Sequence, residues 1–497
     1  FNASLEKGLL FYDSIAMDLI GYDAIALGNH DFDFGPDVLA DFIQGFSVSK
    51  PPFLSVNLDF SAEPRLQELK NQKRIAASTT VKTPAGRVGI IGATTPMLPY
   101  ISSPRNVRVN DMVAEAIMAE VRRLEAMKIN KIILISHLQS ITEDLSMVPY
   151  LSGIDIIIAG GGDEVLANPG QLLVPGDETR IFGSYPLWAT DSSGVQVPVV
   201  TTAGSYSYVG RLVAGFDKAG NLVMIDESQS GPVRVAGGNQ PDAVPPHPEV
   251  QSRVVEPLIE ALNEMSMNVI GVSEVPLDGT RTNIRSRETN LGNLTADALR
   301  WQAAQLAGLY GVSVPQVALQ NGGGIRNGSV IPAGNITELT TFSILPFPNF
   351  VSIVEGISRD QFKQILENPV SRVEFGDGRF AQISGFRFTW DPAGTPQTLD
   401  ANGNVITVGS RIRDVFLDDG TQIVGDGSVI PGPDLTVATI DFLARGGDQY
   451  PFRGAAFTTI GVTYQQSLRN YIQSGLGGVI TAVQYPEGGQ GRITRLP

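Results

Sequence analysis

An apolar run that leads straight into polar side chains decides the fold of the first half of this chain: Tyr22-Asp-Ala-Ile-Ala-Leu27, then Gly28-Asn29-His30-Asp31-Phe32-Asp33. The apolar run predicts a buried strand, and residues 36–44 follow it with helical spacing. An amide, an imidazole and two carboxylates therefore stand where a strand ends. These are the ligand and acid–base types that a phosphoester-cleaving metal site needs. The alternative is a turn in which Asn29 and Asp31 cap the next helix.

Strands and helices continue to alternate beyond this stretch. Strands are predicted at 53–56, near 81, and at 87–91, 131–136 and 154–159, with helices at 4–20 and 111–127. This order indicates an α/β layered domain whose ligands gather at the carboxyl ends of its strands. Residues 197–202 and 208–216 are predicted to pair with each other and to close the domain near residue 235.

A breaker-rich segment then separates two domains. Prolines and glycines crowd residues 236–248, and helical spacing follows at 249–267. A second α/β pattern has helices at 291–306 and 359–366 and a hairpin signal at Asn402-Gly403. We therefore predict a first domain at 1–235, a linker with a connecting helix at 236–268, and a second domain at 269–497.

Composition excludes several classes of function. The 497 residues include 36 basic and 51 acidic side chains, a formal charge of −15, which disfavours a polynucleotide partner. The absence of cysteine rules out thiol catalysis, disulfides and Cys-ligated metals. No stretch approaches the roughly 20 apolar residues of a transmembrane helix.

A second histidine stands at a strand end. His137 follows the apolar run 131–136, and the chain has only three histidines. Taken alone, His137 reads as a core histidine. Because His30 also follows a strand of the same domain, we expect the two to share a metal site.

Three arginines form the main signal of the second half. Arg281 and Arg285 are four residues apart, and Asn321-Gly-Gly-Gly-Ile-Arg326 adds the third. A planar guanidinium binds two oxygens at once, so three of them in an acidic protein predict a phosphate or carboxylate clamp. The alternative is a glycine turn with positive φ and arginines scattered on the surface.

Over nearly its whole length the chain resembles the metallophosphoesterases, and within them the 5′-nucleotidase family. The first half matches G-N-H-[DE]-F-D and a later S-H; the second half matches, in order, Leu345-Pro-Phe347-Pro-Asn349, Ser384-Gly385 and Asp441-Phe442-Leu-Ala-Arg-Gly-Gly-Asp448. The resemblance implies an α/β fold: a metallophosphoesterase-like αββα sandwich, incomplete at its amino terminus, and a second α/β domain that binds nucleotides.

The resemblance also implies roles for individual residues. Asn29 and His137 would be ligands of one of two divalent metal ions, while His30 and Asp33 would form the dyad that stabilises the transferring phosphoryl group. The substrate-binding residues would be Arg281, Arg285 and Arg326 for phosphate, Phe347 and Phe442 for stacking on the base, Asn349 for the base edge, Asp448 for the ribose and Gly385 for close backbone approach.

The chain departs from the family pattern in two places. Where G-H-x-[HQ] is expected, Gly160-Gly161-Gly162-Asp163-Glu164 stands, so glycine replaces one ligand and Asp163 takes the place of another. A carboxylate ligand favours Mg²⁺, Mn²⁺ or Ca²⁺ over Zn²⁺; the alternative is a tight turn with Asp163 capping a helix. The D-x-H and G-D blocks are also missing, so we expect an amino-terminally truncated chain that holds at most one metal and has near-zero phosphohydrolase activity.

The predicted function is metal-dependent hydrolysis of nucleoside phosphate monoesters, with a periplasmic, secreted or cell-surface location expected from the resemblance. One alternative is a related hydrolase of nucleotide-sugars, cyclic nucleotides or other phosphorus or sulfur esters. Another is a nucleotide-binding protein without turnover. A nucleotide or related phosphoester is the expected partner in each case.

Overall fold

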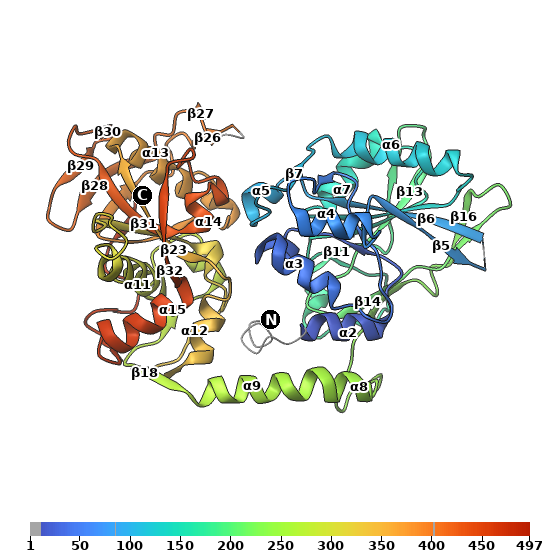
Figure 1. The fold of residues 1–497 in the computed structure, drawn as a ribbon, viewed down its shortest axis with the longest axis horizontal. Coiled ribbons are helices and arrows are strands. Elements are labelled where there is room, and N and C mark those ends of the chain that lie inside the picture. The colour runs from blue at the N-terminus through green and yellow to red at the C-terminus, as the bar shows by residue number, and fades with distance from the viewer. Residues whose placement is uncertain (1–10, 85, 401–402) are drawn as a thin grey trace. The chain divides into compact units, whose positions relative to one another are not determined.

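The computed structural model describes residues 11–84, 86–400 and 403–497 and contains two compact units (Figure 1). The units divide between Ile259 and Glu260, inside helix α9 (Glu256–Met267). Together with α8 (Pro248–Val250) and η4 (Gln251–Val255), α9 forms the helical segment predicted at 249–267. Among the described residues, no helix is both long and apolar enough to cross a membrane.

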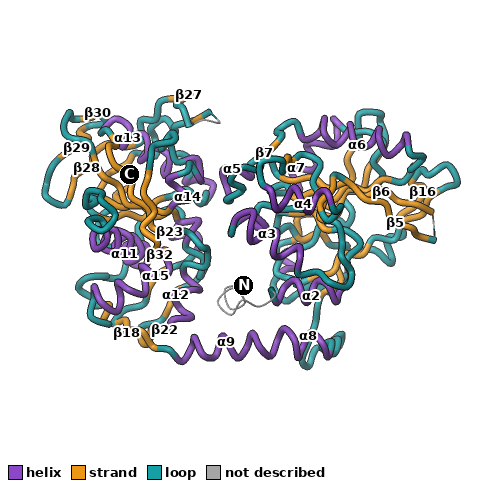
Figure 2. The backbone as a smooth tube through the Cα atoms, viewed as in Figure 1, coloured by secondary structure: helices purple, strands orange, loops and turns teal. Residues whose placement is uncertain are grey.

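A six-stranded sheet forms the centre of the first unit (Figure 2). In spatial order its strands are β12 (Leu187–Thr190), β13 (Gln196–Val200), β9 (Ile156–Gly160), β8 (Ile132–His137), β6 (Gly86–Thr94) and β5 (Ser78–Thr83). The four inner strands are parallel and the two edge strands antiparallel. Helices α6 (Val113–Ala126) and α7 (Ile141–Met147) contribute Ile117, Val121 and Met147 to the same buried core as Leu134 of β8.

A smaller sheet forms the second layer of this unit. It consists of the parallel strands β1 (Ile25–Ala26), β2 (Phe53–Leu54) and β4 (Ile75–Ala76), in that spatial order. The core around it includes Leu39 of helix α3 (Gly35–Gln44) and Leu66 of α4 (Pro64–Asn71). Gly92 of β6 allows the layers to meet, since a Cβ there would lie 2.4 Å from Leu54 O. The predicted αββα arrangement is confirmed.

The predicted pairing of residues 197–202 with 208–216 is wrong. Strand β13 pairs with β9 and β12, whereas β14 (Tyr208–Arg211) pairs with β17 (Gly231–Arg234), and β15 (Ala214–Phe216) pairs with β16 (Leu222–Ile225). Ser205 and Tyr206 have positive φ angles of 61° and 55°, so the chain turns out of the central sheet after β13. Sequence periodicity carries no signal of that turn.

The second unit is built on two five-stranded sheets. The first contains β24 (Ala381–Ser384), β20 (Val317–Asn321), β31 (Leu435–Ile440), β23 (Phe350–Ile357) and β32 (Phe457–Thr463). The second contains β30 (Ser428–Val429), β29 (Gln422–Gly425), β28 (Ile412–Leu417), β25 (Phe386–Trp390) and β34 (Ile493–Arg495). Helix α11 (Asn290–Leu306) is largely buried against the first sheet, and α13 (Arg359–Val370) contributes Phe362 and Ile365 to the same core.

Short elements carry several of the predicted motifs or lie beside them. In the first unit these are η1 (His30–Phe32), α5 (Leu98–Ile101) and β10 (Val165–Leu166); in the second they are α10 (Arg281–Ile284), η5 (Gly322–Gly324), α14 (Asp441–Ala444), η7 (Gly447–Gln449), α15 (Tyr464–Asn470) and η8 (Tyr471–Gly475). The hairpin predicted at Asn402-Gly403 is flanked by the antiparallel strands β26 (Thr398–Leu399) and β27 (Val405–Thr407). Asn402 itself lies outside the described residues.

Candidate functional site

His30 and Asp33 form a hydrogen-bonded dyad in the first unit, at the turn that follows β1. His30 Nδ1 lies 2.7 Å from Asp33 Oδ2, and the hydroxyl of Ser102, just after α5, donates to Asp33 Oδ1 at 2.8 Å. Two segments distant in sequence therefore fix the carboxylate, which in turn orients the imidazole. The His30 side chain is 59% exposed, so its ring is accessible to a ligand.

Asp31 closes the same turn. The Gly28 amide donates to Asp31 Oδ2 at 2.7 Å, and burial raises the pKa of this carboxyl to about 6. Neither Asn29 nor Asp31 caps the following helix α3, whose N-cap is Phe34 and has no side-chain cap hydrogen bond. The capping alternative is therefore wrong for this motif.

Asn29 instead meets His137 at the carboxyl end of β8. Asn29 Oδ1 lies 3.1 Å from His137 Nε2 and accepts a hydrogen bond from Gln139 Nε2 at 3.3 Å. Burial lowers the pKa of His137 to about 4, with a further contribution from the charge of His30. The imidazole is therefore neutral near pH 7, the form that binds metals. Gly28 permits this contact, because a Cβ there would come within 2.5 Å of the ring.

Beside His137 the chain leaves β9 at Gly160 and turns at a bend at Gly161. Gly161 has φ +89°, and a Cβ there would lie 1.6 Å from Leu138 O and 3.1 Å from His137 Cδ2. The next element is strand β10, so Asp163 does not cap a helix and that half of the alternative is wrong. The Asp163 carboxylate lies against Gly204, where a Cβ would be 2.7 Å from Asp163 Oδ1. In the described ranges, no three His, Asp or Glu side chains gather as a metal site.

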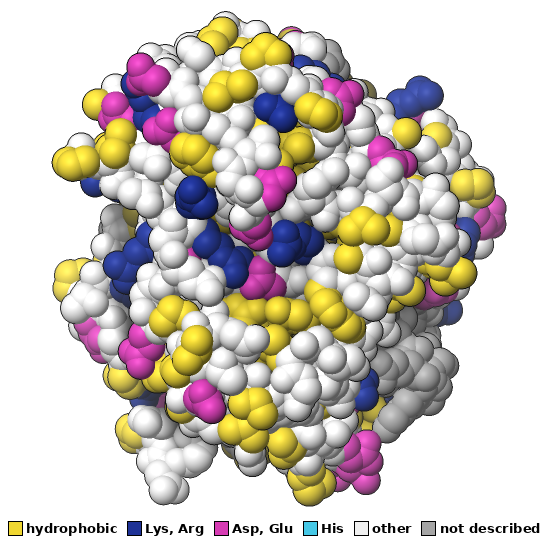
Figure 3. All heavy atoms as spheres, turned by 90° about the vertical axis from the view of Figure 1, so that its left-hand side faces the viewer, with side chains coloured by type: hydrophobic (Ala, Val, Ile, Leu, Met, Phe, Trp, Pro, Cys, Tyr) yellow, Lys and Arg dark blue, Asp and Glu magenta, His cyan; other side chains and the backbone are white. Residues whose placement is uncertain are grey.

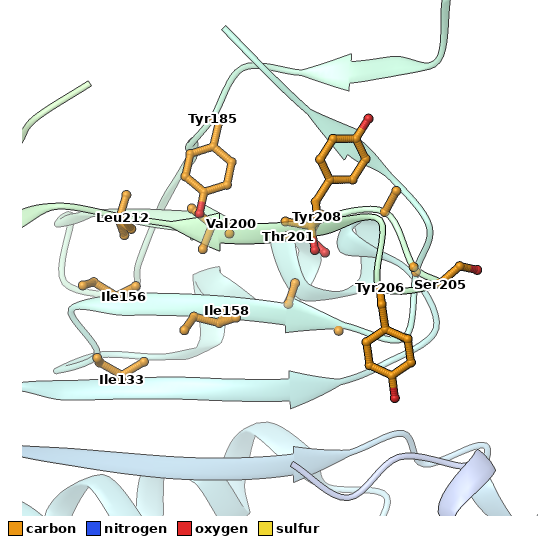
Figure 4. Close-up of a pocket in the computed structure, with 18 residues that line it drawn as sticks. Ile133, Ile156, Ile158, Tyr185, Val200, Thr201, Ser205, Tyr206, Tyr208 and Leu212 are labelled. Carbon is orange, nitrogen blue, oxygen red and sulfur yellow. The ribbon is translucent and has the colours of Figure 1, made fainter. Parts of the chain in front are cut away.

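A cavity of about 650 Å³ adjoins this turn (Figure 4). Ile133, Ile156 and Ile158 line it from β8 and β9, and Tyr185 and Tyr208 line it from the neighbouring segments. Ile158 lies in a central strand and is nevertheless 44% exposed. The apolar cavity therefore lies beside the carboxyl end of β9, next to residues 160–162.

In the second unit, Arg281 and Arg326 both lie close enough to Arg285 for their charges to act on it. Arg285 is buried, donates to Gly376 O at 3.4 Å, and has an Nε atom with no hydrogen-bond partner within the described part of the chain. Burial lowers the pKa of Arg285 to about 10, and the positive charges of Arg281 and Arg326 lower it further. An anion bound here would offset both the lost hydration and the mutual repulsion.

Asp448 lies next to this arginine group. Asn321 Nδ2 donates to Asp448 Oδ2 at 2.6 Å, and Asn368 Nδ2 donates to the Asp448 carbonyl at 3.0 Å. Desolvation raises the pKa of Asp448 to about 6, while Arg379 and Arg285 oppose the rise. The residue has φ +51°, uncommon outside glycine, so the fold holds this carboxylate at a local conformational cost.

Both predicted phenylalanines are partly buried at the edge of the core near these charges. The Phe347 ring centroid is 5.3 Å from the Arg326 guanidinium, and the Phe347 amide donates to Tyr464 Oη at 3.0 Å. Phe442, in α14, packs against the backbone of Gly447, next to Asp448. The Asn349 carbonyl accepts from the Tyr464 amide, which brings Asn349 to the same neighbourhood.

Gly385 does not belong to this group. Strand β24 runs antiparallel to β20, with Ala381 opposite Asn321 and Ser384 opposite Ala318. Gly385 therefore follows the end of β24 that is remote from Asn321 and Asp448. Gly378 is the glycine at the site: a Cβ on it would lie 3.6 Å from Asp448 Oδ2, and its Cα faces Gly323.

Residue-level reasoning missed several members of the site. Asn321, Asn368, Gly378 and Arg379 surround Asp448, and Ser102 supports the dyad. Asn321 belongs to a stretch that the sequence had already singled out for Arg326. The others lie in segments without a motif, so only the fold brings them to the site.

Comparison with known proteins places these features in context. Residues 269–454 match the family model described as "5′-nucleotidase, C-terminal domain". The structure resembles that of a 5′-nucleotidase precursor from Thermus thermophilus, with a TM-score of 0.74, 31% identity, and coverage of 98% of this chain and 86% of that one.

Two curated relatives extend the comparison. Protein 5NUC of Lutzomyia longipalpis is 31% identical over 77% of this chain and 65% of its own length. The trifunctional nucleotide phosphoesterase protein YfkN of Bacillus subtilis is 29% identical over 87% of this chain and 28% of its own length. The chain thus spans less than two thirds of either relative.

Proposed function

The chain belongs to the 5′-nucleotidase family, and from this premise we propose that it hydrolyses the phosphate ester of nucleoside monophosphates with a divalent metal ion. The observation that carries the proposal is the association of three guanidinium groups with Asp448 and a half-buried phenylalanine in one unit. Such a site matches the phosphate, ribose and base of a nucleotide. A site that bound only inorganic anions would not need a phenylalanine side chain beside the arginines.

The second unit would bind the substrate. Arg281, Arg285 and Arg326 would pair with phosphate oxygens, and Asp448, held by Asn321, would accept hydrogen bonds from ribose hydroxyls. Phe347 and Phe442 would stack on the base, and Asn349 would meet its edge. Stacking of this kind is worth about 1–3 kcal/mol per base.

The first unit would supply the chemistry. Asn29 Oδ1 and neutral His137 suit a divalent ion, and we propose Asp163 as a third ligand. When bound, such an ion supplies Lewis-acid polarisation of the phosphate and a more acidic water. His30, oriented and polarised by Asp33, would stabilise negative charge on the phosphoryl oxygens during transfer.

The test is phosphate release from adenosine monophosphate with Mn²⁺ present, using the protein as its gene encodes it and its His30→Ala and His247→Ala variants. Residues 1–497 alone are assayed beside them, because the missing D-x-H and G-D blocks predict near-zero release from that chain. We expect release that falls by at least about 100-fold in His30→Ala, within the range for one positioned acid–base group. His247→Ala, outside the dyad, is the matched control and should behave like wild type. Nucleotide binding without any release would instead favour the binding-protein alternative.

We also propose a periplasmic, secreted or cell-surface location, which rests on family membership alone. Immunolabelling of intact and permeabilised cells would test it. Signal found only after permeabilisation of the inner membrane would contradict it.

A further inference from the structure

A second cavity, of about 730 Å³, lies in the second unit. It is at the opposite end, from the arginine group, of the five-stranded sheet that contains β20 and β24. Its wall includes Ser384 and Gly385, which end β24 opposite Ala318, whereas the nucleotide motifs begin at Asn321. Ala318 and Asn321 are three residues apart along β20, a distance of roughly 10 Å. The cavity is therefore distinct from the proposed nucleotide site, and its size is typical of small-molecule pockets.

One face of helix α11 forms the floor of this cavity. Asp297, Arg300, Trp301 and Ala304 line it with spacings of three, one and three residues, which place all four on one side of a helix. Figure 3 shows one face of the second unit, on which basic and acidic side chains gather near apolar ones. The floor thus combines charge with an aromatic surface.

A hydrogen-bonded chain fixes the aromatic wall. The Tyr471 and Tyr485 hydroxyls are 2.9 Å apart, Tyr485 donates to Asp297 Oδ2 at 2.9 Å, and Arg492 binds both Asp297 oxygens at 2.7 and 2.9 Å. The rings of Trp301 and Tyr471 are 5.6 Å apart with a 47° tilt. The aromatic surface is therefore pre-organised, which reduces the entropy lost on binding a ring.

The charges of this cavity are unevenly paired. Arg492 neutralises Asp297, whose two oxygens already receive three hydrogen bonds. Arg300 contacts Asp418 through Nη1 alone, at 3.3 Å, and Asp418 is 63% exposed, so the pair is weak. Arg387 stacks on Phe416 at 4.8 Å and is exposed. With three arginines and two aspartates, the lining keeps a positive charge beside the rings.

We propose that this cavity binds a small aromatic anion, whose ring packs on Trp301 and Tyr471 and whose charged group pairs with Arg300 and Arg387. Gly385 supports the arrangement, because it has φ +88° and a Cβ there would lie 2.6 Å from Arg300 Nη1. The anionic group is a carboxylate or a phosphate, and both chemistries fit a guanidinium fork.

The test is isothermal titration calorimetry of the full chain in EDTA with three probes of one ring: 1-naphthoate, 1-naphthyl phosphate and the neutral 1-naphthamide. At least one acid should bind 10-fold or more tightly than the amide, and the stronger acid identifies the class of anion. Acids that bind no better than the amide, or not at all, would overturn the proposal.

Variants place the binding in this cavity. Arg300→Gln and Trp301→Leu should each weaken binding of the stronger acid at least 10-fold, while Arg300→Lys and Trp301→Phe, which keep charge and ring, should stay within about threefold of wild type.

The matched control is Arg413→Gln, since Arg413 is 34% exposed against 35% for Arg300 and pairs with a single exposed aspartate. Equal losses in Arg300→Gln and Arg413→Gln would refute the assignment.

Discussion

Gly161 is the residue at which sequence pattern and structure disagree most clearly. The family pattern places a metal-ligating histidine there, yet the backbone has φ +89° and no space for a Cβ. A histidine at 161 would require the turn to move before its ring could reach a metal. The local backbone therefore requires glycine at position 161, and Gly161→His alone does not supply a metal ligand.

The first prediction follows from this geometry. Gly161→Ala should lower the free energy of unfolding by more than the roughly 1–2 kcal/mol that a left-handed backbone costs an L-residue, because its Cβ also meets Leu138 O. Gly170→Ala is the matched control, with φ +86° and nothing within 4 Å of the added carbon. Urea denaturation of both variants measures the difference. Equal losses would show that the turn adjusts freely.

The second prediction concerns Asp448, whose pKa is raised to about 6 by burial. Only the ionised carboxylate can accept hydrogen bonds from two ribose hydroxyls. The affinity for adenosine should therefore rise about 10-fold from pH 5 to pH 7, as the ionised fraction of Asp448 grows. Asp448→Asn should bind weakly and without this pH dependence. The raised pKa has the opposite effect on stability. Protonated Asp448 contributes in full to the free energy of unfolding below pH 3.8, the ordinary pKa of the carboxyl, and this contribution is lost as the pH rises through 6. A flat affinity profile in the wild type would contradict the assigned role.

At the scale of elements, long periodic segments were predictable and short paired strands were not. Helices α6, α11 and α9 and strands β8 and β9 fall where apolar spacing placed them, because their own residues determine which face is buried. The pairing of β14 with β17 depends on a turn at Ser205 and Tyr206, far from its partner in sequence. In the same way, the positions of Arg281, Arg326 and Asp448 were predictable as motifs, but Gly378 and Asn368 join them only through the fold.

The third prediction concerns the carboxy-terminal strand β34. Buried Glu288 accepts hydrogen bonds from the Gln490 and Ile493 amides and from Asn293 Nδ2, so one carboxylate ties β34 to the start of α11. Glu288→Ala should cost roughly 2–4 kcal/mol, since it leaves buried amides without an acceptor. Hydrogen exchange of residues 490–497 should speed up. Glu274→Ala, which removes a single exposed bond to Ala482, is the control and should cost less than about 1 kcal/mol. Similar losses in both would argue against this anchor.

At the scale of the whole molecule, the residues proposed for recognition and those proposed for chemistry lie in different compact units. The fourth prediction is that the two functions separate by mutation. His30→Ala should abolish phosphate release and leave the Kd for adenosine within twofold. Phe442→Ala should raise that Kd about 10-fold or more, through loss of roughly 1–3 kcal/mol of stacking, while release from a small artificial phosphoester stays near wild type.

Phosphate-release assays and equilibrium dialysis on the protein as its gene encodes it measure both quantities. Loss of adenosine binding in His30→Ala, or of small-ester hydrolysis in Phe442→Ala, would show that the units do not divide the work in this way. Circular dichroism spectra matching those of wild type would confirm that each variant remains folded.

The arginine group has a consequence for how the protein responds to its surroundings. Three like charges, one of them buried, are held together by the fold at a cost in stability, and any phosphate that enters relieves part of that cost. The melting temperature of the protein should therefore rise with the phosphate concentration of its solution, by the ordinary linkage between binding and folding. Because free phosphate is also the product of the proposed reaction, the same clamp would make the enzyme most robust, and most inhibited, where its product accumulates.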